Sequence, residues 1–191
     1  NFKISDKESP FEIKSKGDAF DFNLQCDYNG NSKDRMIVHG KPPFKFYKYE
    51  HLDSFSNKEC EFFMPPNGDN LLAILQEHKN LREQVEDIFF ASGLELTLDA
   101  KDNKIKALKR FSHTAVLYPY AMLADSIHKV IFYLAAIETN RQSVLIFEDP
   151  ASNSYPPYTK YLADRITNDE SNQYFVATHN HYFLQGLLKG P

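Results

Sequence analysis

The sequence predicts a mixed α/β fold, in which a parallel sheet with covering helices adjoins an antiparallel, β-rich lobe. Residues 144–147 are apolar without polar alternation, which is typical of a strand covered on both faces. A second short apolar run, 174–177, follows a helix-like segment at 158–166. Strand, helix and strand in this order predict one parallel βαβ unit. The strict alternation of residues 20–26 instead predicts a half-buried antiparallel strand.

The composition indicates a packed globular protein. Of the 191 residues, 42% are hydrophobic and 14% aromatic, which favours a buried core over a disordered chain. The formal net charge of −4 gives no support for a broad nucleic-acid-binding surface, although a local basic patch stays open.

Several features favour a cytoplasmic protein. No apolar run approaches the roughly 18 residues of a membrane span, and no signal peptide is visible. Cys26 and Cys60 lie far apart without metal-ligand spacing, so we expect buried, reduced thiols. The chain begins without methionine and stops just after an apolar helix begins to develop, so we expect a piece of a larger protein.

The amino-terminal part predicts antiparallel strands. Residues 1–17 are polar and predict an edge strand or a loose arm. Strands at 20–26 and 35–39, joined by a turn at 28–31, predict a hairpin. Residues 44–49 alternate aromatic side chains with lysines, which predicts another antiparallel strand with one solvent-exposed face. A platform for single-stranded nucleic acid is the alternative interpretation of that alternation.

The middle of the chain predicts helices and a second hairpin. Apolar residues keep helical spacing over 71–89, where two helices rather than one are expected, and Gly93 is a suitable end. Residues 94–99 and 104–110 alternate around a polar turn and predict the hairpin.

A connection at 112–120 then leads to a third helix, at about 123–139. This helix is apolar nearly all round after Lys129. We therefore expect it to lie buried beneath the sheet.

Ionisable side chains follow both strands of the predicted parallel unit. Glu148 and Asp149 come directly after the first apolar run, and Pro150 cannot continue a central strand. His179 follows the second run. Because ligands of open α/β sheets bind at the carboxyl ends of the strands, these three side chains are expected to converge at one rim.

The segments Phe147-Glu148-Asp149-Pro150 and Thr178-His179-Asn180 resemble the Walker B strand and the switch-histidine strand of ABC-type ATPases. The likeness is to the soluble AAA-family ATP-binding proteins, which include the structural-maintenance-of-chromosomes and overcoming-lysogenization-defect families. There the pattern is Asp-Glu-Pro and later Thr-His-Ser, so the order of the two acids is reversed here. The resemblance implies a P-loop NTPase fold, ATPase activity, and ATP and Mg²⁺ as cofactors.

The same resemblance implies a role for each side chain of the rim. Glu148 would help to hold Mg²⁺, Asp149 would orient the attacking water, and His179 would contact the γ-phosphate. An Asp in the catalytic position is one methylene shorter than the family's Glu, and a displacement of about 1 Å can cost on the order of 10²-fold in rate.

Two further segments match the family in their order along the chain. Leu123-Ala124-Asp125-Ser126 stands where the family has its Leu-Ser-Asp-Gly signature, with Ala124 and Ser126 in place of serine and glycine. Ala151, Ser152 and Asn153 stand in the position of the dimer-facing D-loop. The resemblance thus implies nucleotide contacts from Leu123, Asp125 and Ser126 within a homodimer.

The family's phosphate loop, Gly-x-x-x-x-Gly-Lys-Ser/Thr, does not occur in this sequence, whose only Gly-Lys pair is Gly40-Lys41. We therefore expect a β-rich lobe with inserted helices at 1–118, and the carboxyl-terminal part of an ATPase core at 119–191. By the resemblance, the phosphate loop would lie upstream. Nucleic acid or an accessory protein could bind through other parts of the complete protein.

Two other classes of function stay open. His179 and His181 with Glu148 or Asp149 could bind a divalent metal ion in a metal-dependent hydrolase, although His181 is expected to open the last helix. The chain could also be a non-catalytic dimerisation module that derives from such an ATPase.

Overall fold

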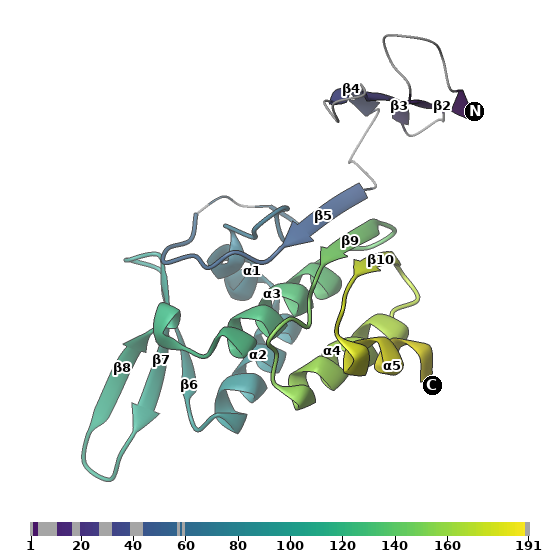
Figure 1. The fold of residues 1–191 in the computed structure, drawn as a ribbon. Coiled ribbons are helices and arrows are strands. Elements are labelled where there is room, and N and C mark those ends of the chain that lie inside the picture. The colour runs from purple at the N-terminus through teal and green to yellow at the C-terminus, as the bar shows by residue number, and fades with distance from the viewer. Residues whose placement is uncertain are drawn as a thin grey trace. The chain divides into compact units, whose positions relative to one another are not determined.

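The computed structural model describes the backbone of residues 2–3, 11–16, 20–26 and 32–38, and then residues 44–56, 58 and 60–189. The chain divides into two compact units, Asn1–Pro43 and Phe44–Pro191 (Figure 1). The functional division that the sequence predicts after residue 118 stays a prediction.

The first unit contains a four-stranded antiparallel sheet. Its strands lie in the order β1 to β4, with β1 at Phe2–Lys3, β2 at Phe11–Lys16, β3 at Phe20–Cys26 and β4 at Ser32–Val38. Strands β3 and β4 pair antiparallel with Phe20 opposite Val38, which confirms the predicted hairpin. The predicted turn at 28–31 lies outside the described residues.

The second unit is built around a parallel sheet of three strands in the order β10-β9-β5. Strand β5 spans Phe44–Lys48, β9 spans Val144–Glu148 and β10 spans Gln173–Ala177. Both β5 and β10 pair parallel with β9. The predicted α/β class is confirmed, and so is the parallel pairing of β9 with β10.

The prediction of an antiparallel strand at 44–49 is wrong, because β5 belongs to the parallel sheet. The faces of this strand also differ from the expectation. Lys45 is buried, with Nζ bonded to Asn140 Oδ1 and 3.7 Å from the centre of the Phe62 ring. Phe44 and Phe46 on the opposite face are 42% and 43% exposed. An amide and an aromatic ring replace the water that a lysine would otherwise require.

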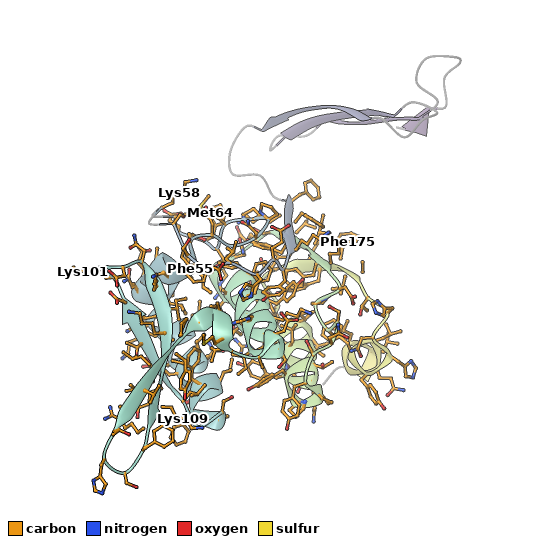
Figure 2. All side chains as sticks on the ribbon, turned by 60° about the vertical axis from the view of Figure 1, so that its left-hand side comes forward. Phe55, Lys58, Met64, Lys101, Lys109 and Phe175 are labelled. Carbon is orange, nitrogen blue, oxygen red and sulfur yellow. The ribbon has the colours of Figure 1, made fainter. Side chains whose placement is uncertain are left out.

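A row of apolar side chains therefore lies on one face of the sheet. Phe46, Ile146 and Phe175 occupy matching positions in the three strands. Phe175, which is labelled in Figure 2, is 62% exposed. Ile146 is half-buried. Parallel sheets are normally covered on both faces, so a bare apolar row on such a sheet is unusual.

Five α-helices and a second sheet complete the described part of this unit. The helices are α1 at Leu71–Glu77, α2 at Lys79–Ala91, α3 at Asp125–Thr139, α4 at Pro156–Thr167 and α5 at His181–Lys189. The two predicted helices over 71–89 are confirmed as α1 and α2. Gly93 takes a positive φ of 70° just after α2, as a glycine at a helix end commonly does.

The second sheet is antiparallel and has one more strand than the sequence predicts. Its strands are β6 at Glu95–Asp99, β7 at Lys104–Arg110 and β8 at Ala115–Pro119. The pairing of β6 with β7 confirms the predicted hairpin. Strand β8 lies where the sequence indicated only a connection, and a short 3₁₀ helix, Tyr120–Met122, leads from it towards α3.

Helix α3 forms the centre of the core, as its composition predicts. Every residue from Ile127 to Ile137 is buried. The Tyr133 ring packs 4.9 Å from the Phe147 ring, and the Phe132 ring packs edge-on against Tyr47 at 6.2 Å. The parallel sheet is thereby attached to α3 through aromatic contacts, which contribute beyond the burial of apolar area.

No helix in the described residues is long and apolar enough to cross a membrane. Cys60, the cysteine whose side chain is described, is half-buried rather than buried and is not in a disulfide. The side chain of Cys26 lies outside the described part of the chain.

The packing of β9 on α3 leads to a stability prediction. Substitution Phe147→Ala removes a fully buried ring and should lower the free energy of unfolding by about 3–5 kcal/mol. Phe90→Ala is the matched control, because Phe90 is 78% exposed, and it should change the free energy by less than about 0.5 kcal/mol. Urea denaturation of both variants measures the difference, and equal effects would contradict this account of the core.

Candidate functional site

The carboxyl ends of β9 and β10 bring Asp149 and His179 together. The amide of Asp149 donates to the carbonyl of Ala177 at 2.8 Å, so β9 stays bonded to β10 one residue beyond its own end. Asp149 Oδ2 then lies 3.1 Å from His179 Nδ1. Because the strands are parallel and adjacent, their carboxyl ends meet at one rim, where the sequence places both side chains.

The carboxylate of Asp149 is only partly satisfied. Its side chain is 27% exposed and contacts His179 through Oδ2. The other oxygen, Oδ1, is buried and has no hydrogen-bond partner in the described residues. A buried carboxylate oxygen without a donor is costly, so this atom is suited to accept a hydrogen bond from water or substrate. The His179 side chain is 82% exposed and accessible to a ligand at the rim.

Glu148 lies on the face of the sheet that carries Phe46 and Ile146. Its Oε1 lies 3.3 Å from Nζ of Lys48, and both side chains are about half exposed. Its carbonyl accepts a hydrogen bond from the Tyr133 hydroxyl at 2.7 Å. The strand end is thus fixed by helix α3, whereas the Glu148 carboxylate is held only by a surface ion pair of small energy.

The signature-like segment lies at the amino end of α3. Leu123 is half-buried, and the helix begins at Asp125, followed by Ser126. Asp125 Oδ2 lies 2.9 Å from Lys129 Nζ. Burial alone would raise the pKa of Asp125, but the hydrogen bond and the charge of Lys129 outweigh it and hold this pKa below its ordinary value.

The D-loop-like segment is anchored at several atoms. Ala151 is fully buried, and its carbonyl accepts a hydrogen bond from Asn180 Nδ2 at 2.8 Å. Ser152 accepts from Lys129 Nζ through its carbonyl at 2.8 Å and through Oγ at 3.1 Å. Asn153 has a positive φ of 50°. This segment is therefore a tightly held turn next to Asp149.

Sequence reasoning assigned no role to Lys129 or Asn180. The sequence does carry a signal for Lys129, because this lysine stands in an otherwise apolar helix four residues after Asp125. Asn180 was part of a recognised motif, but its side chain acts through a carbonyl 29 residues away, and no spacing rule predicts such a contact. Lys48, the partner of Glu148, could have been found only with the parallel register of β5 and β9 in hand.

A metal centre of the kind that hydrolases use finds no support in the part of the chain that the structure describes. No group of three or more histidine, cysteine, aspartate or glutamate side chains there could hold a metal ion. His181 begins α5, as the sequence predicts, and its Nε2 lies 2.9 Å from Gln185 Nε2.

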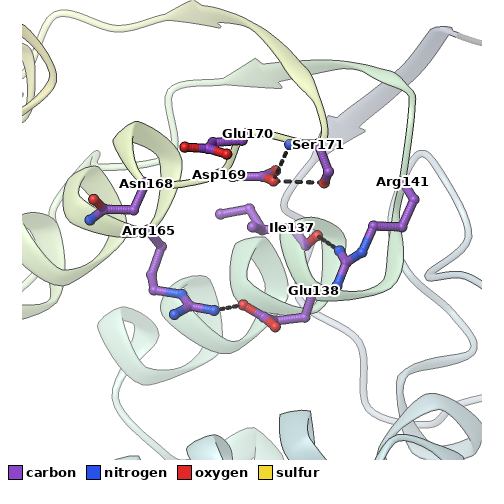
Figure 3. A pocket seen from close by; sticks show the side chains of 8 residues that line it. All are labelled: Ile137, Glu138, Arg141, Arg165, Asn168, Asp169, Glu170 and Ser171. Carbon is purple, nitrogen blue, oxygen red and sulfur yellow. Dashed lines mark hydrogen bonds and ion pairs between the residues drawn. The ribbon is translucent and has the colours of Figure 1, made fainter.

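A cavity of about 330 Å³ lies at the opposite ends of the strands (Figure 3). Its lining includes the ion pair of Glu138 with Arg165. Asp169, also in the lining, accepts hydrogen bonds from the amide of Ser171 at 2.8 Å and from its hydroxyl at 2.6 Å. Burial alone would raise the pKa of Asp169, but these and further hydrogen bonds hold it below its ordinary value. Most polar groups of this cavity are bonded to protein atoms, as is typical of a structural cluster, although Arg165 Nε is buried without a hydrogen-bond partner among the described residues.

Comparisons with known proteins give limited information. Neither a protein-family profile nor the sequence of a curated protein matches this chain. Among solved structures, one that matches is the SMC head domain from Thermotoga maritima, at 11% sequence identity and a TM-score of 0.38. The match covers 92% of this chain, which spans 65% of the length of the SMC head domain. A similarity at this TM-score carries no argument about the site.

A buried histidine beside the signature-like segment gives a pH prediction. His128 is 2% exposed, and its Nε2 lies 2.7 Å from the carbonyl of Tyr120. Burial lowers the pKa of His128 below its ordinary value of 6.5, with a smaller contribution from His51. The unfolded chain therefore binds a proton more readily than the folded one, and the free energy of unfolding should decrease as the pH falls below about 6.5.

Urea denaturation at pH 7.5 and pH 5.5 measures this dependence. His128→Gln keeps a side-chain amide to donate to Tyr120 but does not titrate, so the loss of stability at low pH should become smaller. His113→Gln, at an exposed position, is the control and should leave the loss unchanged. The assignment would be wrong if His128→Gln showed the same pH dependence as the original chain.

Proposed function

We propose that this chain is part of the ATP-binding and ATP-hydrolysing head of a soluble ABC-type ATPase. The observation that carries the proposal is the 3.1 Å contact between Asp149 and His179 at the carboxyl ends of adjacent parallel strands. An acid and a histidine held together at this rim are able to orient a water molecule and to contact a developing negative charge. This is the chemistry that phosphoryl transfer to water requires.

Each side chain of the rim has a distinct part in the proposed reaction. Asp149 would accept a hydrogen bond from the attacking water through Oδ1, the atom that otherwise has no donor. His179, which is largely exposed, would donate a hydrogen bond to an oxygen of the γ-phosphate.

Carboxylate oxygens are the ligands that Mg²⁺ prefers, and the end of β9 would supply one of them. Because the described residues offer no group of three such ligands, phosphate oxygens and water would complete the coordination. Glu148 would hold the ion, directly or through water, after leaving Lys48. The bound ion would supply neutralisation of the phosphate charge. Lys48, released from Glu148, would lie beside the same strand end.

The bare face of the parallel sheet supports a second, phosphate-binding lobe. Phe46, Ile146 and Phe175 form an apolar row on that face, and β10 pairs only with β9 among the described strands. Helix α4 connects β9 with β10 and contacts α3, so the connection lies on the α3 side of the sheet (Figure 1). The other face is left for a helix from elsewhere.

The right-handedness of β-α-β connections predicts the position in the sheet of the strand that would precede such a helix. A right-handed connection that crosses the bare face and leads into β5 must start from a strand beyond β10. The proposed upstream lobe would thus add a parallel strand to the free edge of β10 and lay an amphipathic helix over Phe46 and Phe175. Its phosphate loop, between that strand and that helix, would then lie at the same rim as Asp149.

The proposal also includes a homodimer in which the segment at Leu123, Asp125 and Ser126 contacts nucleotide from the opposite subunit. The amino end of a helix is suited to receive a phosphate, and α3 begins there. The Asp125 side chain is 55% exposed and stays accessible beside that helix end.

A non-catalytic dimerisation module is the second candidate. Asp149 is one methylene shorter than the glutamate that the family uses, and Glu148 forms an ion pair with Lys48. Such a site could bind nucleotide and change conformation with little turnover.

Calorimetric titration with Mg²⁺-ATP tests the proposal on this chain and on a version extended upstream by a phosphate-loop lobe. We expect binding only by the extended version, because the amide cradle and the lysine for the β-phosphate belong to that lobe. In the extended version Asp149→Asn should keep binding and lower the turnover by about 10² to 10⁴-fold.

Asp164→Asn, an exposed change on α4, is the control and should alter neither binding nor turnover. Binding without measurable turnover in the extended version would favour the dimerisation module. If neither version bound Mg²⁺-ATP, the proposed ATPase function would be wrong.

A further inference from the structure

The turn that follows β9 holds Asp149 in an unfavourable backbone conformation. Its φ is +44°, in the left-handed region, and Asn153 at the other end of the turn has a φ of +50°. Residues with a Cβ rarely adopt this region, because Cβ approaches the following carbonyl oxygen; aspartate and asparagine enter it most readily after glycine. Such a conformation persists only where surrounding contacts determine it, and it is often found at functional sites.

Backbone contacts fix only part of this turn. The amide of Asp149 donates to Ala177, and the amide of Ser152 donates back to the carbonyl of Asp149 at 3.2 Å. These two bonds define where the turn begins and how it closes. They do not connect the polar groups of Ala151 and Ser152 to the rest of the protein, although the Ala151 side chain is fully buried in the core.

Two side chains make that attachment. Asn180 holds the Ala151 carbonyl from the start of α5, and its own Oδ1 accepts from the amide of Phe183 at 3.0 Å. Lys129 reaches Ser152 from α3 with hydrogen bonds of 2.8 and 3.1 Å. The turn is thus fastened to the helix beneath the sheet and to the helix that follows β10.

The ammonium group of Lys129 has no spare donor. Lysine has three N–H groups, and Nζ contacts three oxygen atoms: the carbonyl and Oγ of Ser152, and Oδ2 of Asp125 at 2.9 Å. The residue is only 8% exposed, and Nζ also lies 5.7 Å from the centre of the Tyr49 ring. A buried, fully paired cation of this kind holds other groups in place and does not bind a phosphate.

We propose that Lys129 is a positioning residue for Asp149, acting through the turn 149–153, and that Asn180 assists it. By joining Asp125 to Ser152, Lys129 also couples the amino end of α3 to the turn that carries Asp149. The catalytic consequence rests on the function proposed above. The conformational claim does not, because it concerns only the geometry of Asp149 in the protein without nucleotide.

Nuclear magnetic resonance on the 191-residue chain tests the conformational claim. In Lys129→Met, which keeps the length of the side chain and removes its donors, the three-bond coupling of Asp149 that reports φ should change. Amide exchange at Ser152 should become about tenfold faster or more, as expected for the loss of a charge-assisted hydrogen bond. Lys79→Met is the matched control. It removes another lysine that pairs with an acid four residues away, but Lys79 is 74% exposed, and neither signal should change.

Ser152→Ala is the second variant, in case Lys129→Met does not fold. It removes one acceptor of Lys129 at a half-buried surface position and should shift the same signals in the same direction by less. In the double variant the two effects should not add, because both act through one contact. Unchanged Asp149 coupling and unchanged Ser152 exchange in whichever variants fold would overturn the proposal.

The catalytic consequence has a separate readout. In the upstream-extended protein, Lys129→Met should lower kcat while the KM for ATP stays the same, because Asp149 acts on the water and not on nucleotide binding. If the coupling and exchange signals change but the extended protein has no ATPase activity, then the proposed function fails and the positioning by Lys129 stands.

Discussion

The packing of α3 against the parallel sheet is the interaction on which the candidate site depends. Tyr133 is fully buried, packs its ring at a tilt against Phe147 and donates its hydroxyl to the carbonyl of Glu148. The same helix supplies Lys129, which holds Ser152 just beyond the strand. One helix thus fixes both the end of β9 and the turn after it. The acids of the rim are placed by the core rather than by a flexible loop, as the positioning of a catalytic group requires.

One face of the parallel sheet is covered by α3, whereas the other face carries exposed apolar side chains. On the α3 side, Tyr47 and Phe147 are fully buried among aromatic rings. On the other side, Phe46 and Phe175 remain substantially exposed. Exposed aromatic side chains on the face of a parallel sheet mark a surface that favours a partner. The upstream lobe proposed above would bury this row and would at the same time bring a phosphate loop to the rim of Asp149 and His179.

Periodicity was sufficient to predict most helices and strands of the second unit, because burial patterns are local along the chain. At 44–49 it predicted the strand but not its parallel pairing or its buried face, because Lys45 bonds Asn140, a partner 95 residues away. The rim could be predicted because the strands β9 and β10 are joined by one helix, and connection rules then bring their ends together. Lys129 and Asn180 could not be assigned, because their partners are a carbonyl and a hydroxyl in a turn whose shape depends on the folded core.

The central claim is that the rim of Asp149 and His179 receives the γ-phosphate of ATP. The most direct measurement follows the imidazole signals of the histidines by nuclear magnetic resonance while Mg²⁺-ATP and then Mg²⁺-ADP are added to the upstream-extended protein. The account predicts that the His179 signals shift with ATP and much less with ADP, whereas those of the exposed His113 do not move. Nucleotide binding that leaves the His179 signals unchanged would contradict it.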